Sequence, residues 1–141
     1  MMSDYSSHVA VALVTHAPLG QALRLCAQHV LNTTPELLVA DILPTDLPEP
    51  WIQQLVQDLR QTTKPYVLLL CDLYGSTPYH IATGVQRQLT LRGQQVHLLS
   101  GVNVCMVVKA LSDPSASIEE VVQNTLYATQ RGVVHQAPTF P

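Results

Sequence analysis

The chain has 141 residues, a length that fits one domain and leaves little room for two. Apolar residues make up 47% of it and charged residues only 12%, which indicates a folded protein with a sizeable core and excludes a disordered chain. The formal net charge is -3 without any block of like charges, so a nucleic-acid-binding surface is not expected.

The first half of the chain alternates between predicted strands and helices. The stretch HVAVALVT (8–15) predicts a buried strand, because it is apolar on both faces and then stops abruptly. A helix is expected from Pro18 onward, because apolar residues recur there at helical spacing. Those residues are Leu19, Leu23, Cys26 and Val30. A second strand is expected over 36–43, and a second helix over 49–63 with Trp51, Leu55 and Leu59 on one face.

The second half continues the alternation. YVLLLCD (66–72) predicts a third buried strand, followed by a helix that ends before Gly93 and carries Ile81, Val85 and Leu89 on one face. QQVHLLSG (94–101) predicts a fourth strand, and VNVCMVVKAL and SASIEEVVQNTLYATQ predict two more helices. The short GVVHQ (132–136) predicts one last strand. We expect a single domain over 1–141, with its core at about 8–136 and a loose tail at 137–141.

This alternation implies an α/β fold, with an open, mostly parallel four-stranded sheet covered by helices on both faces. In such sheets ligands bind beyond the carboxyl ends of the strands, at the point where the strand order reverses. In a 2-1-3-4 order that point lies between the first and third strands. Those two strands end on His16 and Asp72, which are therefore the first candidates for a functional site.

A histidine is nucleophilic through its unprotonated ring nitrogen, so it needs a partner that fixes the proton on the other nitrogen. A carboxylate does this and stabilises the charged ring during transfer. An isolated His16 would more simply be a polar loop residue, and an isolated Asp72 a turn residue. Their expected position at neighbouring strand ends favours a catalytic pair.

The segment YGSTP (74–78) follows Asp72 directly. Gly75 permits a tight turn, Ser76 or Thr77 caps the next helix, and Pro78 suits its first turn. A helix start also has unpaired N–H groups and the positive end of the helix dipole, so this turn is a candidate anion site. A phosphoryl group on His16 would bring roughly two negative charges to it.

The chain lacks the sequence motifs of several other functions. The chain has no GxxxxGK[ST] or GxGxxG loop for nucleotides and no GxSxG turn of a serine hydrolase. Neither a metal site nor a cofactor is expected. Asn103 is expected to cap a helix, and His80 to be a surface or structural residue.

The cellular location is predicted from what the chain lacks. Its apolar runs, such as VAVALV, are far shorter than the roughly 20 residues that span a bilayer, and the polar start MMSDYSSH does not resemble a signal peptide. The three cysteines are expected to be buried free thiols in a reducing compartment. They are Cys26, Cys71 and Cys105. We therefore predict a cytoplasmic protein.

Three segments, in order and spacing, resemble the mannose-family enzyme IIA domain of the bacterial phosphoenolpyruvate-dependent sugar phosphotransferase system. They are VTHA (14–17), LLCDLYGSTP (69–78) and LLSGVNVCMVVKAL (98–111), where the family reads approximately THG, VDxxGGSP and xxGVNxPMLxxxL. The resemblance extends over nearly the whole chain, from residue 9 to about 130. The chain departs from the pattern at Ala17, where the family has glycine, and at Cys105, where it has proline.

The resemblance implies a role for each site residue. His16 would be the phosphorylated nucleophile and Asp72 the carboxylate that orients it, while Gly75, Ser76 and chiefly Thr77 would contact the phosphoryl group. The implied fold is a parallel sheet in the order 2-1-3-4. The resemblance also implies a homodimer whose subunits exchange a C-terminal strand, and GVVHQ would be that strand.

The function that the resemblance implies is that of a phosphocarrier. His16 would accept a phosphoryl group from phospho-HPr and pass it to a histidine of a IIB-type domain, with the membrane involved only through a permease partner. Two alternatives stay open. One is a regulatory protein whose phosphorylation state controls a partner without sugar transport, and the other is the phosphotransfer subunit of a dihydroxyacetone kinase.

Overall fold

The computed structural model describes residues 8–141, so residues 1–7, most of the stretch for which no signal peptide is expected, lie outside it. Four strands form one parallel sheet in the order β2-β1-β3-β4, which confirms the predicted topology. The strands are β1 (Val9–His16), β2 (Leu37–Ile42), β3 (Tyr66–Cys71) and β4 (Gln95–Leu99).

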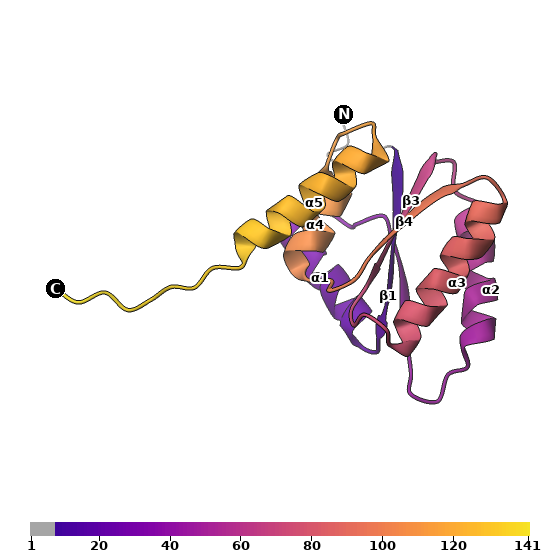
Figure 1. Cartoon of the computed structure of the whole chain (residues 1–141), viewed down its shortest axis with the longest axis horizontal. Helices are drawn as coiled ribbons and strands as arrows, with labels where there is room; N and C mark the ends of the chain where they lie inside the picture. Colours follow the sequence, from indigo (N-terminus) through magenta and orange to yellow (C-terminus); the bar gives the residue numbers. More distant parts are fainter. Residues whose placement is uncertain (1–7) are drawn as a thin grey trace.

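The described residues also form five helices, which cover both faces of the sheet as expected (Figure 1). They are α1 (Leu19–Leu31), α2 (Pro48–Arg60), α3 (Thr77–Leu91), α4 (Val104–Ser112) and α5 (Ile118–Gly132). Helices α2 and α3 pack on one face, and α1, α4 and α5 on the other. Each face has its own apolar cluster, which explains why the strands are apolar on both sides.

The alternation of side chains along β1 sets the directions of its last two residues. Val14 packs into the cluster of α2 and α3, whereas Leu13 packs into the cluster of α1, α4 and α5. Because successive side chains of a strand point to opposite faces, Thr15 lies on the α1 side and His16 on the α2 and α3 side. The strand therefore brings His16 to the sheet face on which α3 packs.

The predicted helix faces are only partly right. The α3 face of Ile81, Val85 and Leu89 is fully buried, as predicted. In α1 the buried residues are Gly20, Leu23 and Ala27, whereas Leu19, Cys26 and Val30 are exposed. Small residues at two of the three buried positions let α1 lie close to the sheet, so the larger apolar residues do not mark its buried face.

The prediction that all three cysteines are buried is also wrong. Cys71, in the central strand β3, is fully buried, but Cys26 and Cys105 are exposed. Both exposed cysteines lie on helices that cover the sheet, where only one side of the helix contacts the core. An apolar neighbourhood in sequence therefore did not predict burial.

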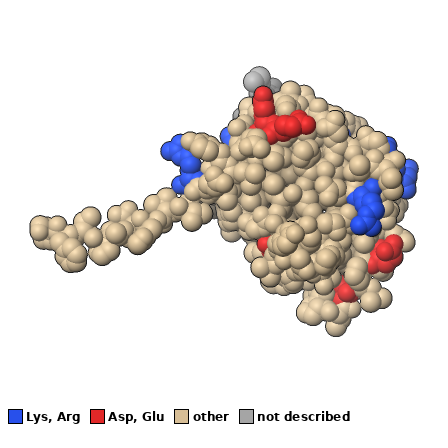
Figure 2. Space-filling view, viewed as in Figure 1, with Lys and Arg blue, Asp and Glu red and all other residues tan. Residues whose placement is uncertain are grey.

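The predicted last strand at 132–136 is not formed within this chain. Helix α5 continues to Gly132, and the residues after it run away from the body of the protein without pairing (Figure 1). A β-strand needs a partner strand to pair its backbone groups, and no described strand lies beside this segment. The segment carries no Lys, Arg, Asp or Glu, and the extended tail is tan throughout in Figure 2. Val133 and Val134 are exposed.

Between residues 8 and 141, no helix combines the length and the apolar character that a membrane span requires.

Candidate functional site

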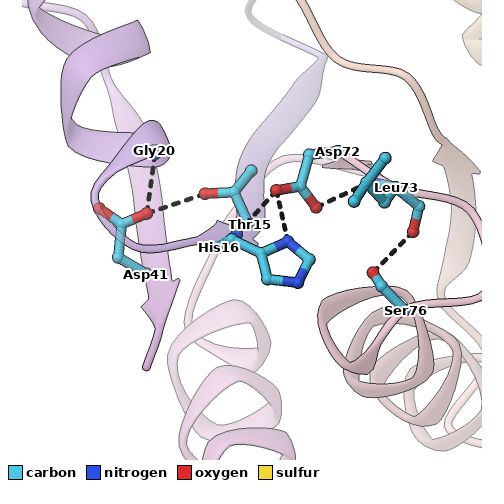
Figure 3. A network of polar contacts seen from close by, with 7 residues as sticks. All are labelled: Thr15, His16, Gly20, Asp41, Asp72, Leu73 and Ser76. Atoms are coloured by element: carbon cyan, nitrogen blue, oxygen red, sulfur yellow. Dashed lines mark hydrogen bonds and ion pairs between the residues drawn. The ribbon is translucent and has the colours of Figure 1, made fainter. Parts of the chain in front are cut away.

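His16 and Asp72 are brought together at the ends of the two central strands. His16 is the last residue of β1, and Asp72 directly follows β3, its neighbour in the sheet. The Nδ1 atom of His16 lies 2.8 Å from Oδ2 of Asp72 (Figure 3). The backbone N–H of His16 donates to the same oxygen at 2.8 Å, and the N–H of Leu73 donates to Oδ1 at 2.8 Å.

These contacts define which ring nitrogen of His16 is free. An ionised carboxylate only accepts hydrogen bonds, so Nδ1 carries the proton that it donates to Asp72. The lone pair of the ring is then on Nε2, which points away from Asp72 (Figure 3). The His16 side chain is 48% exposed, so Nε2 is open to a reacting group from outside. Nε2 is therefore the candidate nucleophile of the pair.

The contacts of Asp72 also keep its carboxyl group ionised. Burial by itself raises the pKa of Asp72, but three hydrogen bonds lower it, from the backbone and ring of His16 and from the N–H of Leu73. When the His16 ring is protonated, its positive charge lowers this pKa further, and the pKa of Asp72 lies below the ordinary aspartate value. Asp72 is thus a fixed negative charge beside Nδ1 at neutral pH.

The lowered pKa of Asp72 predicts an acid-dependent contribution to stability. Because this pKa is lower in the folded than in the unfolded chain, the ionised group stabilises the fold above the unfolded value of about 3.9, and this stabilisation is lost as the pH falls through the folded value. We expect wild type to be more stable than Asp72→Asn at pH 7, with the difference shrinking as the pH falls from about 5 to 3. Urea unfolding at several pH values measures this, and a difference that stays constant over that range would contradict it.

Cys71 is a second potential nucleophile, one residue before Asp72. Burial and the negative charge of Asp72 raise its pKa to about 11. A thiol is nucleophilic only as the thiolate, so Cys71 is unreactive near neutral pH. Of these two neighbouring groups, only the His16 ring is both open to solvent and able to react.

The turn after Asp72 forms as predicted, except for the contact of one hydroxyl. Gly75 has a φ of 80°, a conformation that favours glycine, and Pro78 lies in the first turn of α3. Ser76 is the N-cap residue, but its hydroxyl donates to the carbonyl of Leu73 at 2.6 Å and makes no capping bond. The expected side-chain cap is therefore missing, and the N–H groups of the first turn, such as that of Thr77, have no side-chain acceptor.

A carboxylate that the sequence did not single out lies on the other side of His16. Asp41 of β2 accepts hydrogen bonds from Thr15 and from the start of α1 (Figure 3). The only sequence signal was an acidic residue within the apolar stretch ELLVADIL. That signal does not identify its partners, because Thr15 becomes its neighbour only through the pairing of β1 with β2.

The remaining candidates take the following positions. Asn103 caps α4, accepting from the N–H of Met106 at 3.0 Å as predicted. His80 is exposed, with its ring edge against Tyr79. Ala17 does not have a positive φ, so alanine fits there without backbone strain. Between residues 8 and 141, no three His, Cys, Asp or Glu side chains are grouped to hold a metal ion.

Comparison with solved structures identifies similar folds. A mannose/sorbose specific IIA subunit of a phosphotransferase system from Enterococcus faecalis has a TM-score of 0.81 and 18% identity, covering 95% of this chain and 99% of that one. Phosphotransferase system component EIIA from Streptococcus agalactiae has a TM-score of 0.80 and 16% identity, covering 90% and 96%. A sigma-54 interaction domain protein from Enterococcus faecalis has a TM-score of 0.70 and 16% identity, covering 92% and 94%.

Comparison with sequences gives the family. No curated protein matches the chain. The family model EIIA-man, described as PTS system fructose IIA component, matches residues 10–126. This range includes all four strands apart from the first residue of β1, together with His16, Asp72 and the turn at the start of α3. The chain therefore belongs to the EIIA-man family of phosphotransferase system components.

Proposed function

We propose that the chain is a phosphocarrier that accepts a phosphoryl group from phospho-HPr on Nε2 of His16 and passes it to a histidine of a IIB-type domain. In each step the Nε2–P bond forms or breaks while the P–N bond of the partner breaks or forms. The single observation that carries this proposal is the bond between Nδ1 of His16 and Asp72, because it leaves Nε2 as the free nitrogen. Family membership supports a phosphocarrier role in general.

The proposed receiver of the phosphoryl oxygens is the turn formed by Gly75, Ser76 and Thr77. Ser76 follows Asp72 by four residues and bonds back to Leu73, so the turn is part of the same loop. Helix α3 places the positive end of its dipole there, which favours an anion. The protein's contribution to such a transfer is mainly positioning and charge stabilisation.

The surroundings of the site fit protein partners better than a small sugar. Leu73 and Tyr74, in the loop that carries Asp72, expose 63% and 78% of their surfaces. Exposed apolar side chains beside an open ring suit a transient contact with another protein. In this proposal no sugar touches the domain, and a permease partner provides the only connection to the membrane.

Phosphate labelling tests the proposal. The protein is incubated with labelled phosphoenolpyruvate, enzyme I and HPr, and we expect one acid-labile phosphate per chain. His16→Ala should take up none, and labelling that survives this substitution would overturn the assignment of His16. Adding a IIB-type domain should then remove the label from wild type.

A regulatory role is the second candidate, because the fold is shared with a protein described as a sigma-54 interaction domain protein. In that case His16 would be phosphorylated and the label would stay on the chain when IIB-type domains are added. Binding of a regulatory protein would instead differ between the two phosphorylation states. Passage of the label to a dihydroxyacetone kinase would support the third alternative.

We further propose a homodimer in which the segment after α5 pairs with the sheet of the partner. Both β2 and β4 are edge strands, and edge strands carry unpaired backbone groups. The segment is uncharged and exposes Val133 and Val134, which a partner would cover. Sedimentation should give a dimer for wild type and a monomer for Val134→Asp, whereas a monomeric wild type would exclude the exchange.

A further inference from the structure

Asp41 connects the two segments that flank His16. Its Oδ1 accepts from the hydroxyl of Thr15 at 2.8 Å and from the N–H of Gly20 at 2.7 Å. Its Oδ2 accepts from the N–H of Gln21 at 2.9 Å. We call these four residues the Asp41 network. It joins the end of β1 to the start of α1 across the short loop that begins with His16 (Figure 3).

The backbone at Gly20 lies so close to this network that there is no room for a Cβ atom. A Cβ atom at position 20 would lie 2.6 Å from Oδ1 of Asp41 and 2.7 Å from the hydroxyl oxygen of Thr15. It would also lie 2.8 Å from a methyl carbon of Val39. Only glycine allows the backbone to approach the carboxylate so closely. Thr15 itself is fully buried, so water does not compete for its hydroxyl.

Asp41 also takes the place of a helix cap that α1 lacks. The N-cap position of α1 is Pro18, which has no side-chain acceptor. The carboxylate of Asp41 comes from a different strand and binds the N–H groups of Gly20 and Gln21. At α3, by contrast, the N-cap Ser76 makes no capping bond. Of the helix starts that follow His16 and Asp72, one is thus occupied by a carboxylate and the other is open to an anion.

We propose that Thr15 and Asp41 are positioning residues that hold the backbone at His16, so that Nε2 is aimed at the open start of α3. This inference rests on the proposed phosphocarrier function. The ring is fixed through Nδ1 by Asp72, and the backbone is fixed on its other side by the hydrogen bond of Thr15. Neither Thr15 nor Asp41 touches the phosphoryl group, so their effect passes through the direction of His16.

Thr15→Val tests the proposal, because valine keeps the shape of threonine and removes the hydroxyl. We expect the rate of phosphoryl transfer to His16 at saturating phospho-HPr to fall about 10- to 100-fold, with little change in KM. Thr15→Ser, which keeps the hydroxyl, should restore most of the rate. Thr125→Val is the matched control, since Thr125 is equally buried but its hydroxyl has no partner within residues 8–141. It should leave the rate unchanged.

Comparison of Asp41→Asn with a control variant distinguishes an effect on the transfer rate from an effect on stability. The amide lacks the second acceptor oxygen, so we expect both a lower Tm and a slower transfer. Asp113→Asn is the control, since Asp113 is a buried carboxylate near the end of α4 that accepts from Ser115 and Asn124. It should lower the Tm and leave the rate unchanged. Unchanged transfer in Thr15→Val and Asp41→Asn would overturn the proposal.

Nitrogen NMR of the His16 ring gives a readout that does not depend on transfer. In Thr15→Val and Asp41→Asn we expect the Nδ1 and Nε2 signals to shift from their wild-type positions, and in Thr125→Val and Asp113→Asn to stay. If wild type takes up no phosphate, the proposed function is wrong. The NMR signals would still test whether the Asp41 network positions the His16 ring. Ring signals identical to wild type in both site variants would overturn it.

Discussion

Asp72→Asn is expected to slow phosphoryl transfer to His16 by about 10²- to 10⁴-fold, at most the loss of about 10⁴-fold seen when asparagine replaces the carboxylate that orients the histidine of a serine protease. In wild type, the backbone N–H and the ring of His16 both donate to Oδ2, and the N–H of Leu73 donates to Oδ1. An amide has only one acceptor oxygen. If the amide oxygen faces His16, the NH₂ group faces the N–H of Leu73, and two donors oppose each other. If the oxygen faces Leu73, the NH₂ group faces the His16 ring.

The second of these arrangements explains the size of the expected loss. An NH₂ group facing Nδ1 favours the ring tautomer in which the proton lies on Nε2, and a protonated Nε2 is not nucleophilic. Without the negative charge, the positive ring that forms during transfer is also less stable. Asp72→Asn should therefore lower the maximal rate much more than the apparent affinity for the donor.

Rapid-quench measurement of the first turnover with phospho-HPr tests this expectation. Asp58→Asn is the control, because Asp58 is a carboxylate on α2 that accepts a hydrogen bond from Gln54 of the same helix. The control should transfer at the wild-type rate. If Asp72→Asn were as fast as the control, the orienting role of Asp72 would be wrong, although His16 could still be the phosphorylated residue.

The sequence predicted His16 beside Asp72 once the strand order 2-1-3-4, which the family resemblance implies, was applied to it. Two apolar stretches that end on polar residues become neighbours once the sheet is parallel and ordered 2-1-3-4. This prediction did not depend on the exact last residue of each strand, because the first polar residue after an apolar stretch shows where the strand leaves the core. Gly75 and Pro78 were predictable for a local reason, because glycine allows the positive φ of the turn and proline has the φ that the first helical turn requires.

Contacts that depend on side-chain direction were not predictable in this way. The hydroxyl of Ser76 could either cap α3 or bond back to Leu73, and the sequence is the same in both cases. Asp41 could not be assigned to the start of α1, because Gly20 and Gln21 lie in a segment about 20 residues away. Similarly, GVVHQ has the composition of a strand, but a single chain supplies no partner for it.

Ser76→Asp is expected to keep the fold and to slow phosphoryl transfer about 100-fold. Aspartate is among the best N-cap residues, and its carboxylate would accept from the N–H of Tyr79, because Pro78 has no N–H to donate. The gain from this cap offsets the loss of the present bond to Leu73, so the Tm should not fall. The same carboxylate would occupy the proposed phosphoryl site and repel a group that carries roughly two negative charges. Like charges about 4 Å apart cost about 1–4 kcal/mol, depending on exposure, which corresponds to this loss of rate.

Ser117→Asp is the matched control for the added charge. Ser117 is the N-cap residue of α5, where its hydroxyl accepts from the N–H of Glu120 at 3.3 Å. Ser117→Asp changes the net charge equally, at a helix start that is not proposed to bind phosphate, so its transfer rate should match wild type. Of the two variants, only Ser76→Asp should keep its Tm and yet lose transfer rate. The reason is that the start of α3 cannot bind a carboxylate cap and a phosphoryl group at the same time. A transfer rate in Ser76→Asp equal to that of the control would mean that the phosphoryl group is bound elsewhere than at the start of α3.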